Sequence, residues 1–223
     1  MPIFGTVGQC NPDLLLDGEY VILSDFIPNV TFGVTMKKFA LTISVFMLLW
    51  AASASAHGPV RQKLKESIAI DAPPQAVWDV IKDFGDMSWH PNVEKTTVEG
   101  GNEKGAVRVL TLKDGGTITE ELKKYNAKKM SYAYKITDMS TVKTIEYSGK
   151  EEPIKVLPVT NYSATITVKG KGDGSEVIWK AAYYRGYMNN NPPEELNEDA
   201  ANSAVKTVLQ AGLENLKKIA DAQ

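Results

Sequence analysis

A series of strand-like segments followed by one amphipathic helix constrains the fold of this chain most strongly. Apolar side chains fall at every second position in five segments, the spacing that turns one face of a β-strand toward a core. These segments are residues 107–112, 117–125, 131–137, 160–168 and 177–185. An apolar stripe at helical spacing follows them, formed by Val205, Val208, Leu209, Gly212, Leu213, Leu216 and Ile219. The patterns predict an α+β domain in which a curved antiparallel sheet wraps a long C-terminal helix and leaves a cavity between them.

Two short helices are expected before the main series of strands. A strand over residues 64–71 comes first, with its apolar side chains on one face. Pro73 and Pro74 then begin a helix, because proline suits the first helical turn, and Gly85 ends it. Residues 86–92 follow as a second short helical piece or a turn.

Turn and cap residues predict where the elements are joined. Asp114-Gly115 and Asp173-Gly174 are expected to form hairpin turns, because both residue types can take positive φ. Asn191 is the expected N-cap of the long helix, with the proline after it at the first helical position.

The segment over residues 139–159 has no sustained period and contains two prolines. One interpretation is a lid over the mouth of the cavity. The other is an exposed insertion between two strands, because connecting segments usually run over the surface.

Charge and cysteine content exclude several classes of function. The 223 residues include 25 Lys and Arg and 27 Asp and Glu, a formal net charge of −2. No excess of basic residues is present to hold a nucleic-acid backbone, so nucleic acid is not an expected partner. The one cysteine, Cys10, precedes the export segment described next. The following domain therefore has no thiol for a disulfide, for catalysis or for metal binding.

Residues 36–56 have the order of a secretory signal peptide. Met36 and two lysines precede an apolar stretch, and small residues ending at Ala56 follow it. We expect cleavage after Ala56, a periplasmic domain over residues 57–223, and an upstream stretch over residues 1–35 that is spurious or disordered. The alternative is an uncleaved membrane anchor, because the apolar stretch is just long enough to span a bilayer.

Several short motifs resemble those of a known superfamily. They are KDFGDMSWHP at residues 82–91, GTITEEL at 116–122, LPVTNY at 157–162, YRGY at 184–187 and NPP at 191–193. With the order of elements, they resemble the SRPBCC superfamily of polyketide cyclase/dehydrase and START-like lipid-transfer proteins, and most closely the MxaD-type proteins. The resemblance implies a helix-grip fold, a periplasmic location and a role near methanol dehydrogenase and its cytochrome c acceptor.

The adjacent acids Glu120 and Glu121 must face opposite sides of their strand. Glu120 shares the apolar side with its neighbours at positions 118 and 122, and a buried carboxylate needs a partner. Arg108 or Arg185 could supply it. The pair would be either a polar anchor inside the cavity or a structural ion pair at the edge of the sheet.

Histidine chemistry is limited to two positions. His90 is either an acid/base or ligand contact at the cavity mouth or a packing residue in a rigid turn; we favour packing. His57 at a new N-terminus could chelate copper only with a second histidine, so no metal is expected. No Ser/His/Asp triad can be assembled, so no catalytic residue and no cofactor is predicted. The residues expected to line the cavity are Trp89, His90, Arg108, Glu120, Tyr134, Tyr162, Trp179, Tyr183 and Arg185.

Three functions fit this sequence, and the cavity discriminates among them. We favour a non-enzymatic periplasmic binding or accessory protein. Either its cavity holds a small apolar or amphipathic molecule, or its surface assists electron transfer between a dehydrogenase and a cytochrome, and a small, closed, dry cavity is expected for the accessory role. A cyclase- or hydratase-like enzyme would instead bring Glu120, Arg108 and His90 together in a wide cavity. A lipid carrier would have a long apolar tunnel.

Overall fold

A computed structural model describes residues 58–222. The predicted signal segment at residues 36–56 and the upstream residues 1–35 lie outside this described part, as does His57. Between residues 58 and 222, no helix combines the length and the hydropathy needed to cross a bilayer.

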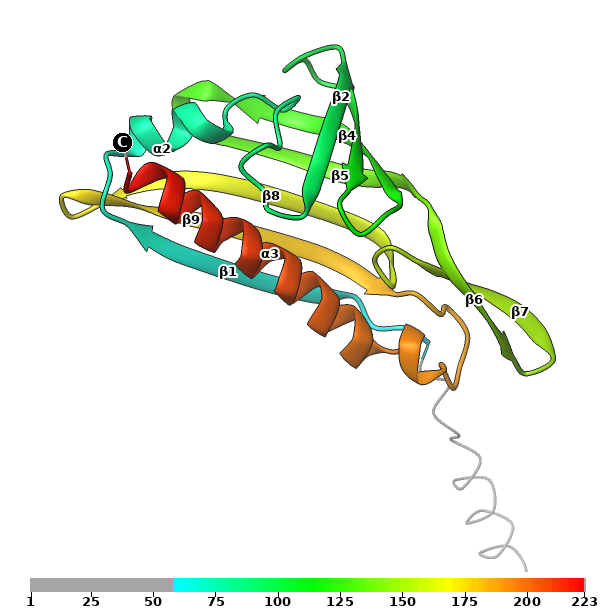
Figure 1. Cartoon of the computed structure of the whole chain (residues 1–223). Helices are drawn as coiled ribbons and strands as arrows, with labels where there is room; N and C mark the ends of the chain where they lie inside the picture. The colour runs from blue at the N-terminus through cyan, green and yellow to red at the C-terminus, as the bar shows by residue number, and fades with distance from the viewer. Residues whose placement is uncertain (1–57, 223) are drawn as a thin grey trace, which may run out of the picture. The chain divides into compact units, whose positions relative to one another are not determined.

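A seven-stranded antiparallel sheet forms the body of the domain (Figure 1). Its spatial order is β1-β9-β8-β5-β4-β3-β2, so the first strand pairs with the last. The strands are β1 (Gln62–Ile70), β2 (Val93–Glu99), β3 (Val107–Leu112), β4 (Thr117–Asn126), β5 (Ser131–Met139), β8 (Val159–Lys171) and β9 (Gly174–Arg185). A short 3₁₀ turn over Ala127–Lys129 joins β4 to β5.

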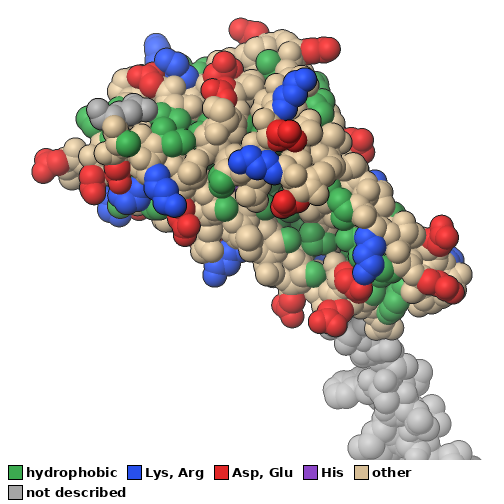
Figure 2. Space-filling view, viewed as in Figure 1, with side chains coloured by type: hydrophobic (Ala, Val, Ile, Leu, Met, Phe, Trp, Pro, Cys, Tyr) green, Lys and Arg blue, Asp and Glu red, His purple; other side chains and the backbone are tan. Residues whose placement is uncertain are grey.

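The long helix α3 (Glu198–Ala220) lies across one face of this sheet (Figure 1). Its buried residues come from one stripe, because residues three and four apart share a helix face. They are Ala201, Val205, Leu209, Gly212, Leu213, Leu216 and Ala220. This stripe meets the inward positions of the strands, and the predicted α+β helix-grip fold is confirmed. The face that carries α3 shows intermingled acidic, basic and hydrophobic side chains (Figure 2).

One short helix, α2 (Pro74–Ile81), follows the first strand where two short helices were predicted. It begins at a proline as expected and buries Val77, Trp78 and Ile81. The expected second piece at residues 86–92 consists of turns. Its start is fixed by a side chain, because the Asp86 carboxylate accepts the backbone N–H of Ser88 at 2.8 Å. Such local bonds compete with a helical turn.

The two predicted hairpin turns lie one residue away from their expected places. Gly115 and Gly116 take positive φ of 92° and 88°, so the turn after β3 uses the glycine pair. A Cβ at Gly116 would lie 2.5 Å from Cγ1 of Val156, so this position also needs the close approach that glycine allows. At the β8–β9 turn, Gly172 takes the positive φ of 59°.

The start of α3 was predicted too early. Its N-cap is Asn197, whose side chain accepts the backbone N–H of Ala200 at 2.8 Å. Asn191, the predicted cap, takes a left-handed φ of 53° in the connection from β9. A 3₁₀ turn over Glu194–Leu196 separates the two asparagines.

The segment without sustained period forms a β-hairpin, a structure that the sequence did not predict. β6 (Thr141–Tyr147) and β7 (Lys150–Lys155) pair only with each other in a second, two-stranded sheet. The hairpin projects beyond the large sheet (Figure 1), and most of β6 is exposed on both faces. The Tyr147 hydroxyl donates to the Asn191 carbonyl at 2.6 Å, which ties the hairpin to the connection before α3.

Candidate functional site

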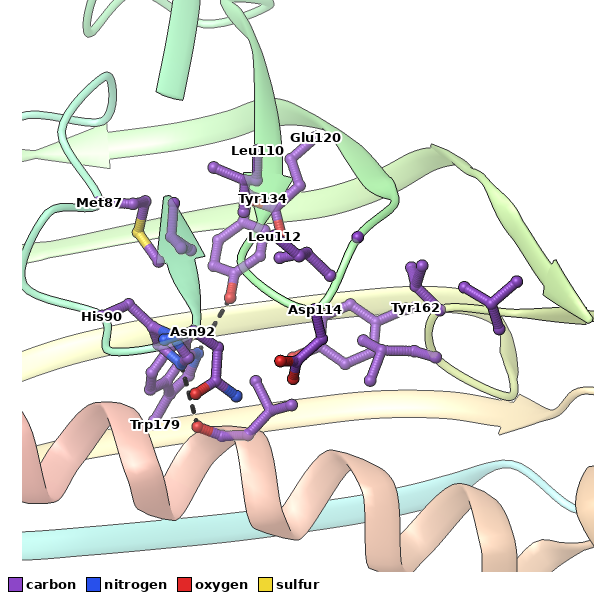
Figure 3. A pocket seen from close by; sticks show the side chains of 16 residues that line it. Met87, His90, Asn92, Leu110, Leu112, Asp114, Glu120, Tyr134, Tyr162 and Trp179 are labelled. Carbon is purple, nitrogen blue, oxygen red and sulfur yellow. Dashed lines mark hydrogen bonds between the residues drawn. The ribbon is translucent and has the colours of Figure 1, made fainter. Parts of the chain in front are cut away.

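A pocket of about 370 Å³ lies between the sheet and α3. Strands, loops, the base of the hairpin and α3 all contribute to its wall (Figure 3). The apolar part of the lining consists of Met87, Val93, Leu110, Leu112, Val142, Val156, Leu157 and Val208. The remaining lining residues are His90, Asn92, Asp114, Gly115, Glu120, Tyr134, Tyr162 and Trp179. The pocket therefore combines an apolar wall with a few polar groups, which is the usual composition of a small-molecule site.

Glu120 reaches the pocket from β4 and is held by Arg108 of β3. The two residues are direct cross-strand partners, and Arg108 Nε donates to Glu120 Oε2 at 2.6 Å. Arg108 also donates to the Phe84 carbonyl at 2.8 Å, and its guanidinium lies 4.2 Å from the centre of the Phe84 ring. The ring of Tyr134 lies on the guanidinium as well, at 5.1 Å. Arg108 is therefore shielded from solvent and holds the Glu120 side chain in position from behind the pocket wall.

Burial governs the protonation of this pair. It raises the pKa of the Glu120 carboxyl above its ordinary value, while the charge and hydrogen bond of Arg108 act against that rise. Burial also acts to lower the pKa of Arg108. The charge of Glu120, with smaller contributions from Tyr132 and Tyr134, outweighs this effect and leaves the guanidinium pKa above its ordinary value. Arg108 therefore stays charged, and the pair brings little net charge to the pocket.

Two tyrosines and a tryptophan form the aromatic end of the pocket. Trp179 Nε1 donates to the Tyr134 hydroxyl at 3.1 Å, so the Tyr134 proton remains free to donate (Figure 3). The rings of Tyr134 and Tyr162 lie 6.4 Å apart. Burial raises the pKa of both hydroxyls well above the ordinary value, so both stay protonated. They are donors and acceptors for a bound molecule, and neither is a base.

His90 lines the pocket while both of its ring nitrogens are engaged. Nε2 donates to the Val208 carbonyl of α3 at 3.1 Å, and Nδ1 accepts the Asn92 N–H at 3.3 Å. This arrangement requires the neutral ring protonated at Nε2. Burial lowers the pKa of His90 below 6.5, and the positive charges of Arg108 and Lys113 act in the same direction. Its two hydrogen bonds hold the ring between its own turn and α3, while the ring also forms part of the pocket wall.

Of the nine residues expected to line the cavity, five do so: His90, Glu120, Tyr134, Tyr162 and Trp179. Trp89 lies behind the wall, with its ring 5.6 Å from Trp179. Arg108 lies behind Glu120, and Tyr183 stacks behind Tyr162 at 6.0 Å and donates to Asn202. Arg185 belongs elsewhere, because it pairs with Glu198 at the start of α3 and donates to the Tyr187 carbonyl. The alternative pairing of Glu120 with Arg185 is therefore wrong.

Sequence reasoning missed the lining residues that come from loops and from α3. Asp114 was interpreted only as a turn residue, although its carboxylate points toward the pocket (Figure 3). Asn92 and Met87 come from turns, and Val142 and Val156 come from the unpredicted hairpin. The one available signal was the motif at residues 82–91, whose Trp-His-Pro end adjoins the pocket.

No metal-binding cluster is present in the described part of the chain. Across residues 58–222, no group of three or more His, Cys, Asp or Glu side chains is placed to hold a metal ion. The hypothetical copper ligand His57 lies outside these residues.

The fold and the pocket define a helix-grip protein with the architecture of a small-ligand-binding domain. A family model described as polyketide cyclase / dehydrase and lipid transport matches residues 61–221. The chain belongs to this family, and the predicted SRPBCC relationship is confirmed.

Several solved structures share this fold. The protein XoxI from Bacillus cereus is 28% identical with a TM-score of 0.55, and the match covers 70% of this chain and 94% of that one. An uncharacterised protein from Bacillus thuringiensis is 26% identical with a TM-score of 0.55, over 73% of this chain and 100% of that one. A protein from Nitrosospira multiformis is 22% identical with a TM-score of 0.52, over 70% and 94%, and shows the fold alone. Among curated proteins, none matches this chain.

Proposed function

We propose that this protein is a periplasmic accessory protein that holds one small amphipathic molecule in the pocket beneath α3. The observation that carries the proposal is the pocket itself, about 370 Å³ with an apolar wall and polar groups from Glu120, Tyr134 and Tyr162. Burial of an apolar ligand in such a space is favourable, and the polar groups fix its orientation.

The size of the pocket supports a small ligand over a long-chain lipid. Ligand sites commonly measure roughly 300–1,000 Å³, and this pocket lies near the lower end. Its lining residues gather in one region between the sheet and α3, a shape that suits a short ligand better than an extended chain. A carrier of whole membrane lipids is therefore the less favoured alternative.

A cyclase- or hydratase-like enzyme is the second candidate, because Glu120 and His90 line the same pocket. The hydrogen bonds favour the accessory role. One Glu120 oxygen is held by Arg108, and both His90 nitrogens already have partners. A general acid or base must be able to exchange a proton with its substrate, which these contacts hinder.

The resemblance to MxaD-type proteins extends the proposal to methanol oxidation. Methanol dehydrogenase and a cytochrome c are the proposed partners, and the signal-like residues 36–56 would deliver the protein to the periplasm. The similarity to XoxI, at 28% identity, is consistent with this assignment. N-terminal sequencing of the mature protein tests the export step: a chain that begins at His57 supports it, and one that retains residues 1–35 contradicts it.

Binding of a neutral fluorescent probe, N-phenyl-1-naphthylamine, tests the pocket directly. Leu112→Trp places a large ring in the lining and is expected to weaken probe binding at least tenfold. Val107→Trp, on the exposed face of the same strand, is the matched control and leaves binding unchanged. Equal binding to the Leu112→Trp variant would mean that the probe binds elsewhere, and the proposal would fail.

Two further measurements separate the candidate roles. Native mass spectrometry of the purified protein identifies any molecule that copurifies with it, and recovery of that molecule unchanged after incubation supports binding without catalysis. A pull-down at low salt from periplasmic extract tests partnership, because weak charged contacts persist there. Failure to retain either the dehydrogenase or the cytochrome counts against the role in methanol oxidation.

A further inference from the structure

The charged groups that face the pocket all have the same sign. Asp114 and Glu120 are the two ionisable acids of the lining, and among residues 58–222 no lysine or arginine lines it. Lys113 adjoins Asp114 in sequence, but it is exposed and lies outside the lining. A molecule entering this space therefore meets carboxylates and no ammonium or guanidinium group.

Glu120 presents an unused acceptor at the inner end of the pocket. Its Oε2 accepts from Arg108, and within residues 58–222 its second oxygen has no hydrogen-bond partner. Arg108 is fully buried and covered by the rings of Phe84 and Tyr134, so its charge offsets that of Glu120 but none of its N–H groups lies in the lining. The accessible part of this ion pair is its negative end.

Asp114 places a second carboxylate on the solvent-exposed side of the pocket. It belongs to the turn between β3 and β4, is exposed, and points toward Asn92 and α3 (Figure 3). No ion pair of Asp114 exists within the described residues. A ligand that fills the pocket therefore lies close to this carboxylate.

The remaining polar groups suit a neutral or cationic ligand equally well. The Tyr134 and Tyr162 hydroxyls can donate to or accept from a hydroxyl group. The π faces of these tyrosines and of Trp179 attract a cation. His90 is held neutral by its two hydrogen bonds and contributes no positive charge.

We propose that the pocket selects amphipathic molecules whose polar end is neutral or positively charged, such as an alcohol or an alkylammonium, and discriminates against carboxylates and phosphates. This inference rests on the proposed ligand-binding function. An anionic head group would lose its hydration beside the Asp114 carboxylate and the free acceptor oxygen of Glu120, and no lysine or arginine of the described lining could donate to it.

The test uses three ligands with the same ten-carbon chain and different head groups. 1-Decanol, decyltrimethylammonium and decanoate compete with N-phenyl-1-naphthylamine for the purified protein at pH 7.5 and low salt. The alcohol and the ammonium are expected to displace the probe at concentrations at least tenfold lower than decanoate. Equal displacement by decanoate would overturn the charge selection while leaving the ligand-binding function intact. Absence of probe binding would overturn both.

Variants at Asp114 show whether the charge itself is responsible. Asp114→Lys is expected to reduce the preference against decanoate at least threefold, and Asp114→Asn is expected to give an intermediate value. Asp173→Lys makes the same charge change in the distant β8–β9 turn and should leave the preference unchanged. Equal preferences in Asp114→Lys and Asp173→Lys would contradict the electrostatic basis of the proposal. Asp114 is chosen because it is exposed, so its replacement leaves the core packing intact.

Discussion

Arg108 and Glu120 lie opposite each other on β3 and β4, and a 2.6 Å hydrogen bond joins their buried side chains. Both side chains belong to the core, where few other charged groups of residues 58–222 are buried. A buried ion pair often contributes little net stability, but loss of one partner leaves an uncompensated charge. We therefore expect that replacing one partner destabilises the protein more than replacing both.

Arg108→Met is expected to destabilise the domain by roughly 3–5 kcal/mol, because it leaves the Glu120 carboxylate buried without its partner. The double variant Arg108→Met/Glu120→Leu should recover most of that loss, since it removes both charges. Urea unfolding of both variants measures the difference. Similar destabilisation in the single and double variants would contradict this account.

The lowered pKa of His90 leads us to expect that the free energy of unfolding decreases in mild acid. Burial lowers its folded pKa below 6.5, so below about pH 6.5 the unfolded chain binds a proton that the native protein does not bind. The free energy of unfolding should therefore fall as the pH drops, by at most about 1.4 kcal/mol per pH unit, until the pH passes the folded pKa. Urea unfolding between pH 7.5 and pH 5 measures this slope.

His90→Gln serves as the comparison for the acid effect. Glutamine can still donate to the Val208 carbonyl but does not titrate, so its unfolding free energy should change less over the same pH range. The carboxylates titrate in both proteins and cancel in the difference. If both proteins lose stability in parallel, His90 is not the responsible group.

Replacing Gly212 by alanine is expected to destabilise the protein, although alanine is the better helix former. A Cβ at this position would lie 2.6 Å from His90 Cδ2 and 2.9 Å from Trp179 Cζ3. Gly212→Ala should therefore cost roughly 1–3 kcal/mol of overpacking, against about 1 kcal/mol gained from helix propensity. Thr207→Ala on the exposed side of α3 is the control and should be neutral or slightly stabilising. Thermal unfolding compares the two, and a stabilised Gly212→Ala variant would show that α3 shifts freely.

The helix cap offers a test of the start of α3. Asn197→Ala is expected to cost about 1 kcal/mol, because it removes the side chain that accepts the Ala200 N–H. Asn191→Gly should be neutral or stabilising, because Asn191 has positive φ and caps no helix. Denaturant unfolding distinguishes the two positions. A larger cost at Asn191 would favour the earlier helix start that the sequence suggested.

The sheet and its burial pattern could be predicted because apolar side chains at every second position are visible in a single sequence. The side of β4 that holds Ile118, Glu120 and Leu122 is buried as the pattern indicates, and Glu120 finds Arg108 on the neighbouring strand. Which residues of a strand share a face follows from their positions in the sequence alone. This needs no knowledge of what the strand packs against.

The β6–β7 hairpin and the part of the pocket lining that comes from loops could not be predicted in this way. β6 is mostly exposed on both faces, so burial imposes no alternation on its sequence. The pocket brings together Met87, Asp114, Val156 and Val208 from distant parts of the chain, and no local pattern records that proximity. The predicted cap Asn191 was wrong because the sequence does not show the backbone path between residues 191 and 197, and it is Asn197 that has the extended backbone and the capping hydrogen bond.

The hairpin has consequences for variation and engineering among proteins of this shape. Its base supplies Val142 and Val156 to the pocket wall, whereas Ser148 and Gly149 turn the chain at its solvent-facing tip. Changes near the base would reshape the binding space, while insertions at the tip would leave it untouched. A peptide tag is therefore best accommodated at residues 148–149, away from the residues that line the pocket.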